Sequence, residues 1–117
     1  MTEKKNVLNP KLNNGVAEIT PDQLFPVLGK VTLIDVRRPD EFTGELRHIP
    51  GSKLVTLGPE LVEFLDAQDR DQEIVFICRS GVRSREACLF SQKIGFKSPI
   101  NLQGGMISWN DYKFPTE

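Results

Sequence analysis

The residues from Cys78 to Ser84 are the part of this chain best suited to chemistry. They read Cys-Arg-Ser-Gly-Val-Arg-Ser and combine a cysteine, a glycine and two arginines, with a third arginine at position 85. A deprotonated cysteine is a strong nucleophile, and neighbouring cations favour that deprotonated form. Positive charge gathered in a protein of formal net charge −1 also attracts anions. The segment therefore predicts a site that activates a thiol and binds an anion.

The surrounding pattern indicates how the thiol is activated. Residues 73–77 form an apolar, β-branched run that predicts a buried strand, and an apolar stripe from Ala87 to Ile94 predicts a helix that begins near Ser84. Backbone N–H groups at a helix N-terminus are unpaired and carry partial positive charge, and Gly81 permits the turn that directs them inward. Such surroundings lower a thiol pKa from about 8.5 to between roughly 3.5 and 7.5. We expect a thiolate at neutral pH that needs no histidine beside it.

These considerations assign the predicted site residues. Cys78 is the catalytic nucleophile, and the loop behind it binds the substrate through its backbone N–H groups. We expect Arg79 and Arg83 to add the electrostatic attraction. The complete predicted substrate-binding loop consists of Arg79, Ser80, Gly81, Val82, Arg83 and Ser84.

The remainder of the chain alternates short strands and helices. Strands are predicted at 16–19, 31–36, 53–55, 73–77 and 100–102, with helices between them and a final short helix after Gly104 and Gly105. This alternation predicts an α/β layered fold around a mainly parallel sheet, in which ligands bind beyond the carboxyl ends of the strands. We expect residues 1–14 to form a partly ordered N-terminal arm and residues 15–117 to form one domain.

Composition excludes several classes of function. With 38% hydrophobic and 26% charged residues, the 117-residue chain is typical of a globular domain. The charge balance predicts no nucleic-acid partner, and no apolar run is long enough for a membrane span. No secretory signal is visible, so we expect a cytoplasmic protein whose two cysteines stay unpaired. One histidine and two cysteines without ligand-like spacing predict no metal and no other cofactor.

The motifs and their order resemble those of the single-domain rhodaneses, the thiosulfate sulfurtransferase family. The likeness covers nearly all of residues 16–112. It is carried by Leu33-Ile34-Asp35-Val36-Arg37, by Asp40-Glu41-Phe42, by His48-Ile49-Pro50-Gly51-Ser52, by the loop from Cys78 to Ser84, and by Gly104-Gly105 with Trp109. The resemblance implies a rhodanese-like α/β fold of about five mainly parallel strands with helices on both faces.

The resemblance also implies a reaction in two halves. Cys78 would take the outer sulfur of a small anionic donor such as thiosulfate and hold it as a persulfide. A thiophilic acceptor, either cyanide or a thiol (including a protein cysteine), would then remove that sulfur. The sequence does not identify the physiological donor or acceptor.

Two alternatives remain open at this stage. Related phosphatases and arsenate reductases use a Cys-x5-Arg loop, whereas Cys78 and Arg83 are separated by four residues and Ile77 stands where those phosphatases usually have histidine. The shorter loop favours a single sulfur atom over a phosphate. The second alternative is a non-catalytic sulfur-sensing or interaction module, which the presence of Cys78 disfavours.

Other conspicuous residues are expected to be structural. Cys88 lies on the apolar stripe of a helix and is expected in the core, as is Trp109. The single histidine, His48, is expected to pack or hydrogen-bond within a bend. The resemblance leaves open whether it or Arg37 contributes to the pocket. We expect Asp35, Arg37 and Glu41 to form ion pairs or hydrogen bonds at strand ends.

Overall fold

The computed structural model describes residues 7–117 and shows a six-stranded mixed sheet. The strand order is β1-β2-β6-β5-β3-β4, and every neighbouring pair is parallel except β1 with β2. The strands are β1 (Lys11–Asn13), β2 (Val16–Ile19), β3 (Thr32–Asp35), β4 (Lys53–Leu54), β5 (Glu73–Ile77) and β6 (Ser98–Leu102).

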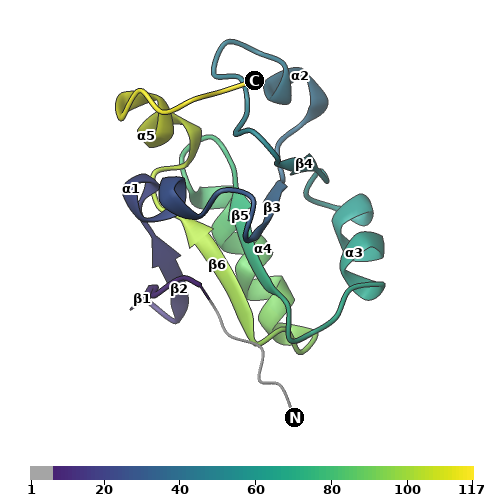
Figure 1. Ribbon diagram of the computed structural model, residues 1–117. Helices are drawn as coiled ribbons and strands as arrows, with labels where there is room; N and C mark the ends of the chain where they lie inside the picture. Colours follow the sequence, from purple (N-terminus) through teal and green to yellow (C-terminus); the bar gives the residue numbers. More distant parts are fainter. Residues whose placement is uncertain (1–6) are drawn as a thin grey trace.

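Helices cover both faces of this sheet (Figure 1). The helical segments are α1 (Pro21–Leu24), the 3₁₀ turn η1 (Phe25–Val27), α2 (Pro39–Phe42), α3 (Pro59–Asp66), α4 (Val82–Lys93) and α5 (Gly105–Asp111). One buried cluster joins the sheet to α3 and α4, and a second joins its other face to α1 and α5. The central strands β5 and β6 are thus buried on both sides, as parallel strands usually are.

The fold predicted from the sequence is confirmed. The structure adds a sixth strand to the expected five. Residues 11–13 lie inside the segment assigned to the N-terminal arm, and they pair with residues 16–18. The first six residues of that arm lie outside the described part of the chain. Helix α4 begins at Val82, two residues before the predicted start. Across residues 7–117, no helix is both long and apolar enough to cross a membrane.

A buried ion pair fixes the chain where β3 ends. Asp35 and Arg37 are 0% and 1% exposed, and the guanidinium donates to both carboxylate oxygens, with the shortest contact at 2.7 Å. Arg37 also donates to the backbone carbonyls of Glu41 and Arg47. The pair therefore ties β3 to the loop that carries α2.

This geometry predicts a large loss of stability on replacing Asp35 with Ala. The variant leaves the Arg37 charge buried without its counter-ion, which costs about 3–5 kcal/mol. Urea unfolding measures the difference. The matched control is Asp40→Ala, because Asp40 pairs with Arg38 at 3.2 Å on the exposed surface, where a pair contributes less than about 1 kcal/mol. Equal losses in the two variants would show that the buried pair has no special role.

Candidate functional site

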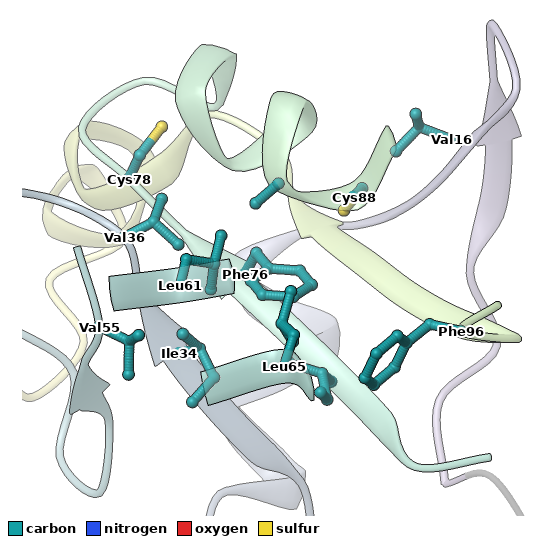
Figure 2. Close-up of a cluster of buried hydrophobic side chains, with 12 residues drawn as sticks. Val16, Ile34, Val36, Val55, Leu61, Leu65, Phe76, Cys78, Cys88 and Phe96 are labelled. Atoms are coloured by element: carbon teal, nitrogen blue, oxygen red, sulfur yellow. The ribbon is translucent and has the colours of Figure 1, made fainter. Parts of the chain in front are cut away.

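Cys78 follows β5 directly and lies at the carboxyl edge of the sheet. Cys78 is 1% exposed and belongs to the buried cluster that joins the sheet to α3 and α4. Figure 2 shows Cys78 at one end of that cluster, with its sulfur directed away from Val36 and Leu61. The side chain is therefore bounded by apolar residues beneath, while its sulfur faces the loop that leads into α4.

Two groups of that loop contact the sulfur. Gly81 adopts a left-handed conformation, with φ of +102°, and its N–H donates to Cys78 Sγ at 3.0 Å. The hydroxyl of Ser84, in the first turn of α4, lies 3.2 Å from the same sulfur. The sulfur thus lies within hydrogen-bonding distance of one backbone N–H and one hydroxyl of the loop.

Helix α5 holds the loop from behind. The N–H of Met106 donates to the Cys78 carbonyl at 2.9 Å, and the N–H of Ile107 donates to the Arg79 carbonyl at 3.0 Å. Gly105 makes this approach possible, since a Cβ on it would lie 2.5 Å from one carbonyl oxygen and 2.6 Å from the other. The Gly-Gly pair after β6 thus allows two backbone segments to pack without side chains between them.

The two arginines expected to bind the anion differ in their ion-pair partners and in their exposure. Arg83 is paired with Glu41 through two hydrogen bonds of 2.6 and 2.8 Å. The Arg83 guanidinium lowers the pKa of Glu41 to about 2, so the pair stays ionised at neutral pH. Arg79 is exposed and forms no ion pair with any residue in the described range. Of these two arginines, Arg79 is therefore the one whose charge is uncompensated.

A cavity of about 220 Å³ opens beside Arg79. Arg37 and Glu41 line it together with Glu45 and Leu46 from the loop after α2. Arg37 reaches this wall while its charge stays paired with Asp35. Of the remaining loop residues, Ser80 and Val82 are exposed at the surface.

The residues expected to be structural are held in the interior or in a bend. Cys88 is fully buried on α4, and burial raises the pKa of its thiol. Trp109 is also fully buried, and its indole N–H donates to the Pro115 carbonyl at 2.9 Å. His48 stacks on Phe42, and its Nδ1 lies 3.0 Å from the Phe42 carbonyl oxygen. His48 is therefore a packing residue of the bend.

The sequence analysis missed Asn101 of β6. This residue is 1% exposed, and its Oδ1 lies 2.5 Å from Ser84 Oγ. A polar residue inside the apolar run Pro99–Leu102 was the available signal. The pairing of Arg83 with Glu41 was also missed, although Glu41 had been expected to form ion pairs.

Comparisons with known proteins find a matching family model and similar sequences. The family model described as "Rhodanese-like domain" matches residues 22–112. The putative sulfurtransferase YtwF of Bacillus subtilis is 40% identical over 77 residues, which are 66% of this chain and 71% of that protein. The thiosulfate sulfurtransferase GlpE of Vibrio cholerae is 27% identical, over 73% of this chain and 77% of its own.

A solved structure gives a further similarity. A Rhodopseudomonas palustris protein of unknown function, described as a possible tyrosine phosphatase, superposes with a TM-score of 0.77 and 28% identity. The match covers 87% of this chain and 85% of that one. The fold therefore accommodates more than one suggested chemistry.

The contact of Gly105 with the loop predicts that Gly105→Ala displaces Cys78. The added methyl overlaps two backbone carbonyls that cannot rotate away, so we expect a loss of about 1–3 kcal/mol from overpacking and a change in the alkylation rate of Cys78. Urea unfolding and alkylation kinetics measure the two effects. Gly29→Ala is the control, because Gly29 also has a positive φ, of +87°, but no atom lies within 4 Å of the added carbon. Equal behaviour of the two variants would contradict the close-approach argument.

Proposed function

Because this chain belongs to the rhodanese-like domain family, we propose that it is a sulfurtransferase that carries a sulfur atom on Cys78. The observation that supports this most directly is the contact of the Gly81 N–H and the Ser84 hydroxyl with Cys78 Sγ. The Gly81 N–H suits a sulfur that bears negative charge at the end of a parallel strand, and the Ser84 hydroxyl does so when its proton turns to the sulfur. Relatives named as sulfurtransferases support the same reaction class.

The first half-reaction loads the sulfur. The Cys78 thiolate attacks the outer sulfur of thiosulfate, a new S–S bond forms to Sγ, and the bond between the two donor sulfurs breaks. Sulfite leaves with the electron pair of that bond, and the protein retains a persulfide whose outer sulfur is anionic. This is covalent catalysis by an activated cysteine.

The second half-reaction transfers the sulfur from the Cys78 persulfide to an acceptor. A nucleophilic acceptor, cyanide or a thiolate, attacks the outer sulfur and takes it, and the electron pair of the persulfide bond returns to Sγ as the thiolate. The acceptor is a small thiol or the cysteine of a partner protein. Both cysteines of the chain are unpaired in the structure, and a reducing cytoplasm would keep them so.

The surroundings of Cys78 favour a small anionic donor. With the residue 1% exposed, a donor must present a slender terminal atom to reach Sγ, as the outer sulfur of thiosulfate does. The exposed Arg79 supplies the positive charge that attracts the other end of such an anion. Arg83 contributes less, since Glu41 compensates its charge.

Phosphatase activity is the second candidate, supported by the name of the Rhodopseudomonas palustris neighbour. Four residues between Cys78 and Arg83 bring the Gly81 N–H to 3.0 Å from the sulfur itself, which favours a single-atom cargo over a phosphate. Turnover of an aryl phosphate or arsenate without sulfite release would select this candidate. An idle Cys78 in both assays would select a sensing or interaction module.

The proposal predicts that thiosulfate adds one sulfur atom to the protein. Intact-mass spectrometry should show this gain, cyanide should reverse it, and Cys78→Ser should abolish it because the persulfide forms on that residue. Cys88→Ala is the matched control, since Cys88 is buried in the core and the variant should still load. Loading that survives in Cys78→Ser would refute the assignment.

The Arg83–Glu41 pair predicts a lower KM for thiosulfate in Glu41→Gln. The amide still accepts a hydrogen bond from Arg83 but no longer neutralises its charge, so the dianion meets an additional cation near the loop. We expect KM to fall roughly threefold at low salt and the difference to shrink as ionic strength rises. Steady-state kinetics across a salt series measure this.

The control for this experiment is Asp71→Asn. Asp71 pairs with Lys97 at 3.2 Å beside the opposite end of β5, and its replacement changes the net charge by the same amount. A KM that falls equally in both variants would indicate a general charge effect, and a KM that rises in Glu41→Gln would show that the pair positions Arg83 instead of masking it.

A further inference from the structure

Asn101 contacts both residues whose groups approach the catalytic sulfur, although it lies on a different strand from Cys78. Its Nδ2 donates to the Gly81 carbonyl at 3.1 Å, and its Oδ1 lies 2.5 Å from the Ser84 hydroxyl oxygen. Gly81 and Ser84 are the residues that contact Cys78 Sγ. Gly81 precedes α4 directly and Ser84 lies in its first turn, so one buried amide links β6 to the site.

The orientation of this amide is fixed by a second strand. Glu18 of β2 pairs with Asn101 across the sheet, and its Oε2 accepts from Asn101 Nδ2 at 2.8 Å. Both hydrogens of the amide nitrogen are thereby used, on a carboxylate and on a carbonyl. A flipped amide would place its oxygen against those two acceptors, so Oδ1 must face Ser84.

The Ser84 hydroxyl has one proton and two candidate acceptors. Asn101 Oδ1 can only accept, so the 2.5 Å contact requires the Ser84 proton to lie between the two oxygens. The hydroxyl lone pairs then face Cys78 Sγ, which suits a protonated thiol that donates to them. An ionised sulfur needs donors instead, and Ser84 can supply one only by turning its proton away from Asn101.

We propose that Asn101 is a positioning residue that competes with Cys78 for the single proton of Ser84 and thereby sets how readily the thiol ionises. Ionisation of Cys78 then leaves Asn101 Oδ1 without a donor among the described residues. The cost of that lost hydrogen bond opposes the charged form. This inference rests on the proposed role of Cys78, but it concerns the resting thiol and needs no sulfur donor.

Replacing Asn101 removes no charged side chain from the surroundings of Cys78. The positive and negative groups on the neighbouring elements are Arg83 of α4, Glu41 of α2, Asp35 and Arg37 at the end of β3, Arg79 in the loop, and Glu18 behind Asn101. None of these residues is replaced in the variants below. A change in the ionisation of Cys78 therefore reports the Ser84 proton and not a change in net charge.

The test is the pH profile of Cys78 alkylation by iodoacetamide, a neutral reagent, with the modified residue identified by peptide mass mapping. In Asn101→Leu the Ser84 proton is free to turn to the sulfur, and we expect the midpoint of the profile to move about one pH unit lower, as one hydrogen bond to a charged group provides. Asn101→Val, with a β-branched side chain suited to a buried strand, is measured as a second variant with the same expectation.

Double variants show whether the effect passes through Ser84. In the Ser84→Ala background, Asn101→Leu should no longer move the midpoint. In the Ser91→Ala background the shift should persist in full, since Ser91 is a buried serine of the same helix whose hydroxyl donates to the Ala87 carbonyl. Thermal unfolding confirms that each variant is folded.

An unchanged or raised midpoint in both Asn101 variants would overturn the proposal, as would a full shift in the Ser84→Ala background. Alkylation reads the thiol directly. A protein that shows the expected shifts but gains no sulfur from thiosulfate would therefore uphold this inference while refuting the proposed function.

Discussion

The hydrogen bond from Gly81 to the Cys78 sulfur requires the chain to reverse direction within three residues, and much of the structure serves to hold that reversal. Gly81 provides the left-handed backbone conformation, and α4 continues from it. On the other side of the loop, backbone N–H groups of α5 fix the carbonyls of Cys78 and Arg79. The loop is therefore held by main-chain contacts on both sides, and the position of the sulfur follows from the packing of two helices against adjacent parallel strands.

Charge near the site is largely compensated. Arg37 is buried against Asp35, and Arg83 is paired with Glu41, so two of the arginines near the loop are held by carboxylates of the fold. A buried arginine without its carboxylate would be costly, which explains why Asp35 accompanies Arg37. Of the two arginines of the predicted loop, Arg79 at the surface is the one without a carboxylate partner in the described part of the chain. Positive charge without a carboxylate partner thus lies at the surface, while the sulfur beneath contacts an uncharged N–H and a hydroxyl.

Local sequence was sufficient to predict the fold and the central cysteine. The apolar run before Cys78, the glycine three residues after it and the helical stripe beyond all lie within 20 residues of Cys78, and such short-range patterns determine elements directly. Pairings between distant residues could not be predicted in this way. Glu41 precedes Arg83 by 42 residues, and Glu18 precedes Asn101 by 83, so their contacts depend on how the strands are ordered in the sheet. Strand β1 was missed for a related reason, since its three residues are all exposed and carry no apolar alternation.

The main-chain attachment of the loop to α5 has a consequence for how such a protein can diverge. Arg79, Ser80 and Val82 point their side chains to solvent, and none of them is needed to hold the loop in place. Exchanging these three residues would alter the charge and shape that an approaching molecule meets while leaving the geometry at the sulfur intact. The same fold can in this way come to bind different molecules through a few surface mutations, while the geometry around its cysteine stays the same.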